Sequence, residues 1–207
     1  HLSSFCKNIS VLSLIGDKKE QEGFIKKNIE KNIVLNFLRK KNSPTIIKKR
    51  FIDRIDNRKI FGIYSLNDEN LKSIEEQKII EKLKNLYTKF DLIIVADYGH
   101  GMITPKIGKF ISNQKKFLSL NAQINSTNIG LRSINKYNKI DNLVINASEL
   151  RYEMNQRDGD LLKLAKKFKD KIKSKYLSVT QGKMGAFTID EKNKIWKCPA
   201  FTNDPID

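Results

Sequence analysis

The sequence predicts an α/β fold with a mostly parallel sheet flanked by helices. From about residue 70 onward, apolar strand-like runs alternate with amphipathic helix-like segments, and the connections between them are short. Such alternation is typical of parallel strands whose crossover helices cover the faces of the sheet. The chain has 207 residues, of which 39% are hydrophobic, so it is long enough and apolar enough to bury a core.

The N-terminal third supplies three predicted elements. Ile9–Gly16 is an apolar run closed by glycine, which is typical of a buried strand followed by a turn. Glu20–Asn32 has Phe24 and other apolar residues at helical spacing, so it predicts a helix. Ile33–Arg39 is a second short apolar segment and is interpreted as a strand or the end of a helix.

A different segment follows at Ser43–Asp68, which is rich in β-branched and aromatic residues. Asp56-Asn57 separates two such runs, so the segment predicts a β-hairpin. Its charged residues, Lys48 and Arg50 among them, are too many for a buried central strand, and we expect a small exposed lid at about residues 44–66. Exposed strands that extend from a domain tend to pair with another copy, so we also expect a homodimer through this hairpin.

The rest of the chain continues the strand and helix alternation. Asn70–Phe90 predicts a long amphipathic helix with its apolar residues, from Ile74 to Tyr87, on one side. A helix after Ile103 is predicted to begin at Pro105 with Thr104 as its N-cap. The other predicted elements are strands within Asp91–Asp97, Phe117–Gln123 and Asn142–Asn146, helices within Ala147–Met154 and Leu162–Ser174, and two strands around a glycine turn within Lys175–Asp190.

The charge balance raises one rival function. Forty Lys and Arg residues against 23 Asp and Glu give a formal net charge of +17, which favours partners that carry phosphates. The lysines are spread over the whole chain and interleave with apolar residues at helical spacing, as on the solvated faces of amphipathic helices. With no zinc spacing, RNP-like motif or helix-turn-helix signal, nucleic-acid binding is the rival hypothesis and not the main one.

The cellular setting is constrained only weakly. Cys6 and Cys198 are far apart in the sequence and lack metal-ligand spacing, so a reduced cytoplasmic location fits best, with a disulfide left open. The longest apolar run, Leu92–Ala96, is strand-sized, and no membrane partner is expected.

Polar residues follow three of the predicted strands, where ligands of parallel sheets bind. In "VADYGHG", Asp97, Gly99 and Gly101 are interpreted either as the floor of a substrate cleft or as a helix cap and a tight turn. His100 between the glycines either meets a phosphate or hydroxyl or is an ordinary loop histidine.

The other two motifs have the same two interpretations. In "INASEL", Asn146 and Glu149 can hold a hydrated magnesium ion and phosphate oxygens, or they are a helix cap and a favourable first-turn charge. In "TQGKMGAF", Thr180, Gly182 and Gly185 can turn backbone N–H groups toward a nucleotide phosphate, or they form a simple hairpin turn.

The order of these motifs resembles that of the PfkB/ribokinase family of carbohydrate kinases over nearly the full chain. Within that family the chain looks most like the heptose-7-phosphate kinases, which act in ADP-heptose synthesis and are often joined to a nucleotidyltransferase. "PTIIKKRFIDR" is similar to their lid strand, and "VADYGHG" is similar to their Asp-Tyr-Gly-Lys-Gly stretch.

The resemblance implies a ribokinase-like fold and ATP-dependent phosphorylation of a sugar or sugar phosphate with Mg²⁺. It implies nucleotide contacts from five residues, with Glu149 also at the metal: Asn146, Glu149, Thr180, Gly182 and Gly185. It implies substrate contacts from four others: Lys48, Arg50, Asp97 and His100.

The resemblance also implies that residues 1–207 are a partial kinase domain. "FTNDPID" is similar to the stretch that leads into Asp-Thr-x-Gly-Ala-Gly-Asp, and Asp207 matches the first aspartate of that motif. The general base would then lie beyond Asp207, and the first sugar-binding glycines would precede His1. We therefore expect these 207 residues to be inactive and the parent protein to be the kinase.

Two departures from the family pattern place the substrate in doubt. His100 stands where the common pattern has lysine, and "LNAQINSTNIGLRSINKY" replaces an Asp-Pro-Lys-like stretch, which indicates a divergent subfamily with its own sugar. The alternative function is a non-catalytic nucleotide-binding or scaffold relative of the sugar kinases.

Overall fold

The computed structural model describes residues 1–18, 20–55, 58–123 and 133–201. The described chain forms two compact units. The first unit comprises His1–Ile79 with His100–Met102, and the second comprises Ile80–Gly99 and the chain from Ile103 onward.

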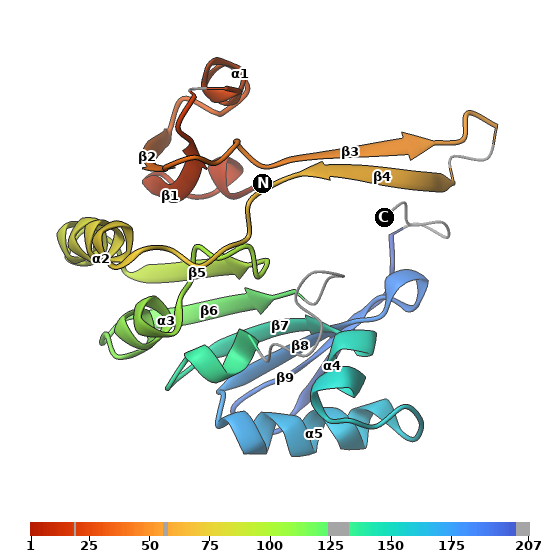
Figure 1. Cartoon of the computed structure of the whole chain (residues 1–207). Coiled ribbons are helices and arrows are strands. Elements are labelled where there is room, and N and C mark those ends of the chain that lie inside the picture. The colour runs from red at the N-terminus through yellow and green to blue at the C-terminus, as the bar shows by residue number, and fades with distance from the viewer. Residues whose placement is uncertain (19, 56–57, 124–132, 202–207) are drawn as a thin grey trace. The chain divides into compact units, whose positions relative to one another are not determined.

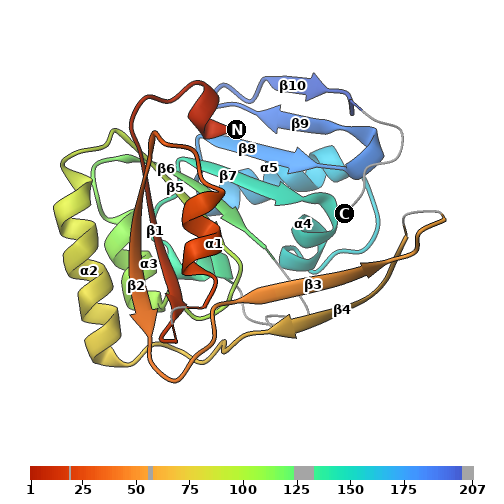
Figure 2. The ribbon, with the colours of Figure 1, turned by 90° about the horizontal axis from the view of Figure 1, so that it is seen from above.

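Two small sheets make up the first unit. Strand β1 (Ile9–Gly16) pairs in parallel with β2 (Ile33–Lys40), so the second apolar segment is a strand and not a helix end. Helix α1 (Glu22–Lys27) connects them, and a short 3₁₀ helix, η1 (Leu2–Ser4), precedes β1. The predicted hairpin is formed by β3 (Ile47–Ile52) and β4 (Lys59–Ser65), which pair antiparallel as a long ribbon (Figure 2). Its predicted turn at Asp56-Asn57 lies outside the described residues.

The second unit contains a six-stranded sheet in the order β10-β9-β8-β7-β6-β5. Four neighbouring strands, from the β5 edge inward, run parallel: β5 (Leu92–Asp97), β6 (Phe117–Ala122), β7 (Asn142–Asn146) and β8 (Tyr176–Thr180). Strands β9 (Ala186–Ile189) and β10 (Ile195–Cys198) continue the sheet antiparallel. The predicted mostly parallel sheet is therefore confirmed.

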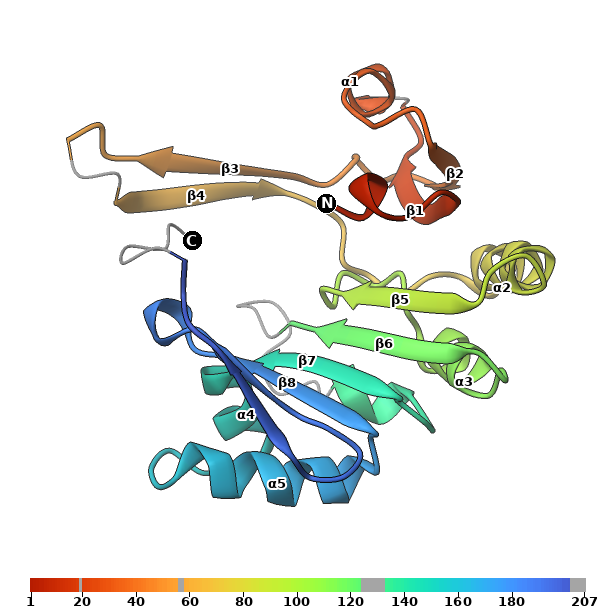
Figure 3. The same cartoon turned by 180° about the vertical axis from the view of Figure 1, so that it is seen from behind.

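Helices cover one face of this sheet. The helices are α2 (Ser73–Tyr87), which the two units share, α3 (Pro105–Ser112), α4 (Ala147–Glu153) and α5 (Leu161–Ile172), with 3₁₀ turns η2 (Ser133–Lys136) and η3 (Gly182–Met184). Figures 1 and 3 show α3, α4 and α5 on the same side, as expected when successive right-handed crossovers step across a sheet in one direction. No helix in the described part of the chain combines the length and apolar composition that a membrane span requires.

Burial alternates along the parallel strands. The core side chains of these strands are fully or nearly fully buried: Leu118, Leu120, Leu143, Ile145, Leu177 and Val179. On the opposite face, Leu92 and Ile94 of β5 are exposed by 48% and 50%. The strands therefore bury one face against the helices, and this packing fixes the positions of the strand ends.

Some expected boundaries differ from the structure. The helix predicted over Glu20–Asn32 is only six residues long, because Asn28 caps it and donates its side-chain amide to the Phe24 carbonyl. None of its residues is buried. Ile74 was expected on the apolar side of α2 but is 72% exposed. Thr104 is the N-cap of α3, as predicted, and accepts the Ile107 amide.

A buried carboxylate joins the strands at their amino ends. Asp141, which is 2% exposed, accepts the Leu118 amide at 3.0 Å and pairs with the Nζ atoms of Lys139 and Lys175 at 3.2 and 3.3 Å. Burial opposes ionisation of Asp141, but the Leu118 amide and the two lysines outweigh it and lower its pKa. One side chain thus ties the start of β7 to the start of β6 and to the residue before β8.

Replacement of Asp141 by Asn is expected to lower the free energy of unfolding at pH 7 by about 1–3 kcal/mol, since a buried charged hydrogen bond is lost. Because the folded-state pKa lies below the ordinary value of 3.8, this stabilisation is present above pH 3.8 and is lost as pH falls through the folded-state pKa. Urea unfolding of the wild type and D141N at pH 7 and at pH 2–3 measures both effects. Asp158→Asn, in an exposed turn, is the matched control; equal stabilities of D141N and D158N would contradict the prediction.

Candidate functional site

The carboxyl ends of the parallel strands bring three of the predicted site residues to one end of the second unit. Asp97 ends β5, Asn146 ends β7 and Thr180 ends β8. Asn146 and Thr180 are direct cross-strand partners in the β7–β8 pairing. Two of the predicted nucleotide contacts therefore lie side by side, although they are far apart in the sequence.

Asn146 and Glu149 form a closed capping box at the start of α4. The Asn146 side-chain oxygen accepts the Glu149 amide at 2.8 Å, and the Glu149 carboxylate accepts the Asn146 amide at 2.9 Å. Glu149 is only 7% exposed. The structural interpretation of this motif is thus realised, because both side chains satisfy backbone N–H groups that the helix leaves without partners.

The capping box leaves room for a second role. Within the described residues, no group of three or more His, Cys, Asp and Glu side chains could hold a metal ion by itself. A magnesium ion in a nucleotide site keeps several waters and takes its other ligands from phosphates, with one or two protein carboxylates. A single buried carboxylate at a helix start, bonded to the strand end that pairs with Thr180, fits an ion of that kind and would not fit an ion that needs a full protein cage.

The two glycines after β8 have different reasons to be glycine. Both have positive φ, +55° at Gly182 and +83° at Gly185. A Cβ atom at Gly182 would meet nothing within 4 Å, whereas one at Gly185 would lie 2.2 Å from the Cys198 carbonyl oxygen. Glycine is therefore needed at position 185 because the backbone at the end of β10 passes too close for a Cβ atom. At position 182 it is needed only because the turn has a positive φ. Both thiols, Cys6 and Cys198, are free.

Asp97 has a set of internal partners that the sequence did not predict. It is 3% exposed, and its Oδ2 atom accepts the Lys136 ammonium and the Tyr137 hydroxyl, each at 3.1 Å. Its Oδ1 atom accepts the Gly99 amide at 3.0 Å, which shapes the turn after β5. Asp97 thus organises the end of the sheet, and its predicted contact with a substrate stays a prediction.

Lys136 and Tyr137 were missed by sequence reasoning. They lie at the end of η2 and directly after it, in "SINKYN", where no spacing or motif distinguishes them from surface residues. Burial, together with the charge of Asp97, raises the pKa of Tyr137, so its hydroxyl remains a proton donor to the carboxylate. Only the fold shows that these residues reach a strand end some 40 positions earlier.

The remaining predicted substrate contacts belong to the first unit. Lys48 and Arg50 lie on the same face of β3 because side chains alternate along a strand. Lys48 lies opposite Tyr64 with its Nζ 5.6 Å from the ring centre, and Arg50 lies opposite Gly62, which presents no side chain to it. His100 is half-buried in the short His100–Met102 segment that belongs to this unit.

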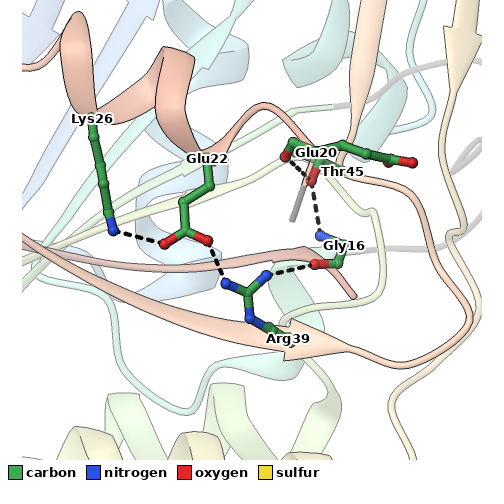
Figure 4. A network of polar contacts seen from close by, with 6 residues as sticks. All are labelled: Gly16, Glu20, Glu22, Lys26, Arg39 and Thr45. Carbon is green, nitrogen blue, oxygen red and sulfur yellow. Dashed lines mark hydrogen bonds and ion pairs between the residues drawn. The ribbon is translucent and has the colours of Figure 1, made fainter. Parts of the chain in front are cut away.

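A polar network fixes the chain that leads into the hairpin (Figure 4). Thr45 accepts the Gly16 amide through its hydroxyl oxygen and donates to the Glu20 carbonyl, both at 3.0 Å. Arg39 reaches the Gly16 carbonyl at 3.2 Å and also pairs with Glu22, which Lys26 contacts from the next helical turn. The hydrogen bond from Lys26 and that from Arg39 lower the pKa of Glu22.

The fold defines the class of protein. The structure resembles that of ribokinase from Giardia lamblia, with a TM-score of 0.70 and 10% identity over 95% of this chain and 61% of that one. It also resembles phosphofructokinase-2 from Escherichia coli in complex with fructose-6-phosphate, with a TM-score of 0.68 and 12% identity over 93% of this chain and 62% of that one. The second unit and the first unit with its ribbon are thus parts of a ribokinase-like fold.

The sequence then places the chain within a family. Residues 1–207 match the pfkB family of carbohydrate kinases along their whole length, and the chain belongs to that family. The predicted fold and family are both confirmed.

Curated relatives of the chain are longer proteins. It is 26% identical to the bifunctional protein HldE of Campylobacter jejuni over 200 residues, which are 94% of this chain and 40% of that protein. It is 29% identical to HldE of Campylobacter fetus over 133 residues, 62% of this chain and 28% of that protein. The chain therefore spans about two fifths of the length of the first of these relatives.

The contrast between the two glycines gives a test of their roles. Gly182→Ala is expected to cost about 1 kcal/mol of unfolding free energy, because only the positive φ is strained. Gly185→Ala adds an overlap with backbone and is expected to cost roughly 2–3 kcal/mol more. Urea unfolding of both variants measures the difference, and equal costs would show that the Cys198–Pro199 backbone yields freely.

Proposed function

We propose that the parent protein of this chain transfers a phosphoryl group from ATP to a sugar or sugar phosphate of the heptose-7-phosphate kind. One observation carries the proposal: the paired ends of β7 and β8 put Asn146, Glu149 and Thr180 beside one another in a chain that belongs to the carbohydrate kinases. Relatives named as bifunctional HldE support the choice of substrate class.

Asn146, Glu149 and Thr180 are proposed to receive the nucleotide. Phosphoryl transfer depends on positioning and on neutralising charge at the phosphates. When bound, Mg²⁺ would supply much of that positive charge. Glu149 would orient its hydrated shell, and the turn at Gly182 would leave backbone close to the phosphates, with Gly185 shaping that turn. The capping box holds Asn146 and Glu149 in place before any ligand binds.

Lys48 and Arg50 are proposed to contact the phosphate of the acceptor. A guanidinium can hold two phosphate oxygens at once, and the glycine opposite Arg50 leaves that side of the ribbon uncovered. Asp97 and His100 remain proposed contacts at the turn after β5, where histidine stands in place of the usual lysine.

The catalytic base is proposed to lie in the parent protein beyond Asp207, so that the 207 residues bind nucleotide without turning it over. A homodimer through the 44–66 ribbon, a fused nucleotidyltransferase and a cytoplasmic location belong to the same proposal. The bifunctional relatives support the fused domain, and the exposure of every residue of β4 supports the dimer.

The function is tested by ADP release from the parent protein on a panel of sugar phosphates that includes heptose 7-phosphate. Sugar-dependent ADP release by the parent, with none by the 207-residue chain, is the expected result. Nucleotide binding by the parent without turnover on any acceptor would instead favour a non-catalytic relative. Salt-sensitive binding to random duplex DNA, with no nucleotide binding, would favour the nucleic-acid hypothesis.

The two roles of Glu149 can be separated by two substitutions. Glu149→Gln keeps a side chain that can complete the capping box but removes the carboxylate, so stability should change little while Mg·ATP binds roughly tenfold more weakly, about 1.4 kcal/mol. Glu149→Ala should also weaken Mg·ATP binding, and it should lower the free energy of unfolding by about 1 kcal/mol. Calorimetric titration of the 207-residue chain and urea unfolding measure both. Unchanged affinity in E149Q would reduce Glu149 to a helix cap.

Arg50 has a matched control on the neighbouring position. In the parent protein, Arg50→Gln is expected to weaken sugar-phosphate binding by about 10- to 100-fold, because bonds from a charged donor contribute roughly 1.5–3 kcal/mol. Lys49→Gln removes the same charge from the opposite face of β3 and should change the affinity less than about twofold. The KM for the sugar phosphate is the readout. Equal effects of R50Q and K49Q would indicate general electrostatic attraction and not a specific contact.

A further inference from the structure

The ribbon of β3 and β4 has little packing support of its own. Every residue of β4 is exposed, and β3 is exposed from Lys48 to Ile52. A two-stranded hairpin is marginally stable in water without a face to pack on. The direction in which the ribbon leaves the first unit is therefore set at its base, where the incoming leg (Ser43–Ile46) and the returning leg (Leu66–Glu69) meet β1 and β2.

The incoming leg is held by close backbone packing. Ser43 and Thr45 are 5% and 6% exposed, and Thr45 bonds to Gly16 and Glu20 as described above. A Cβ atom at Gly16 would lie 2.4 Å from the Thr45 nitrogen, so the leg passes directly against the end of β1. The Ser43 carbonyl also accepts the Asp17 amide at 3.2 Å.

The returning leg packs against Gly101, where an added Cβ atom would lie 2.5 Å from the Glu69 carbonyl oxygen, and it is bonded to one buried ammonium group. Lys40, the last residue of β2, is 8% exposed, and its Nζ donates to the Asn67 carbonyl at 2.8 Å and to the Glu69 carbonyl at 2.6 Å. A longer contact of 3.3 Å joins it to the Asn67 side-chain oxygen. The Asn67 side-chain amide in turn donates to the Ser43 hydroxyl at 3.1 Å, which links the returning leg to the incoming one.

The burial of Lys40 is costly, and stability alone does not explain it. Burying an ammonium group costs several kcal/mol before its partners are counted, and an apolar side chain of similar size often does as well. Burial lowers the pKa of Lys40, although the nearby charges of Glu69, Glu75 and Asp68 oppose this effect. The ammonium group donates three directed hydrogen bonds to the returning leg, which lies in neither a helix nor a sheet. An apolar side chain could not make these bonds.

Loss of these bonds would release the leg more readily than it would unfold the unit. Asn67 is half-buried and Glu69 is exposed, so a small outward movement would give their carbonyl groups to water. An unsatisfied carbonyl that can reach water in this way avoids the penalty of about 1–3 kcal/mol for a buried one.

We propose that Lys40 is a positioning residue for the ribbon: its ammonium fastens the returning leg to β2 and, through Asn67 and Ser43, to the incoming leg. Lys48 and Arg50 are then carried in a fixed direction from the first unit. The use of that direction, to present these two residues to a sugar phosphate, rests on the proposed function; the fastening itself does not.

The test measures ribbon direction within the first unit, without nucleotide or sugar. Spin labels at Val34→Cys on β2 and Ile63→Cys on β4, both exposed positions, are placed in a C6S/C198S background of the full 207-residue chain. Pulsed dipolar spectroscopy gives the distribution of distances between the labels. Lys40→Met is expected to broaden this distribution at least twofold, and Lys41→Met, which removes the neighbouring exposed charge, should leave it unchanged.

The pH dependence gives a readout that a simple packing role would not move. Within the first unit the charged groups that face Lys40 are Asp68, Glu69 and Glu75, and their charges act against the lowering of its pKa. As pH rises toward 10.5, Lys40 loses its proton before a solvent-exposed lysine does, so the wild-type distribution should broaden. The K40M distribution should show no further broadening over the same range.

An unchanged distribution in K40M, with its far-ultraviolet circular dichroism intact, overturns the proposal whether or not the parent is a kinase. If K40M does not fold, Asn67→Ala and Ser43→Ala replace it, since both remove the Asn67–Ser43 hydrogen bond that joins the two legs of the base. Broadening in N67A supports the fastening, and unchanged distributions in both variants overturn it. A failed search for kinase activity would leave the distance measurements untouched.

Discussion

The carboxyl end of the sheet depends on the hydrogen bonds that the buried Asp97 carboxylate accepts. Three donors from two segments meet on it: the Gly99 amide from the turn after β5, and the Lys136 ammonium and Tyr137 hydroxyl from η2 and the residue after it. The Asp97 carbonyl also accepts the Gln123 amide where β6 ends. A charge at this depth is tolerable only when it is paired and fully hydrogen-bonded, and here its partners are the chain segments that must be gathered around a site. At the opposite end of the strands Asp141 joins β6, β7 and the start of β8 in the same way, so each end of the parallel sheet is closed by one aspartate.

The atoms of Asn146 and Glu149 that form the capping box are the same ones to which the proposed function gives a role in ligand binding. A capping box needs an amide or hydroxyl at the N-cap and a carboxylate or amide three residues later, and a magnesium-nucleotide site needs oxygen atoms at the start of a helix. The box holds both side chains in single positions and keeps Glu149 nearly buried. A residue pair held in this way requires little rearrangement when a ligand arrives, which is the physical meaning of a preorganised site.

The sequence was sufficient for the architecture and for the polar residues that end the parallel strands, but not for the residues that reach those strand ends from elsewhere in the chain. Hydrophobic periodicity located β1, β5, β7 and the helices to within a few residues, because burial on one face of a strand or helix leaves a regular pattern. It overestimated α1, where Phe24 has the spacing of a buried residue but lies 66% exposed. It missed β10, whose short run contains exposed charge, and it missed Lys136 and Lys40. Both lysines are indistinguishable in sequence from the other basic residues of a strongly basic chain, since only tertiary contacts select which lysine bonds to Asp97 and which is buried against the returning leg.

The charges of the ribbon also have a consequence for solubility. Both strands of a two-stranded sheet are edges, and this one exposes Phe51, Phe61, Ile60 and Ile63. Lys48, Lys49 and Arg50 give β3 three consecutive positive charges, which repel a second strand that approaches its unpaired backbone, whereas β4 carries only Lys59. The charges therefore protect the edge of β3 from aggregation but not that of β4. Copies of this chain would associate first through β4, whether in a specific dimer or in a precipitate.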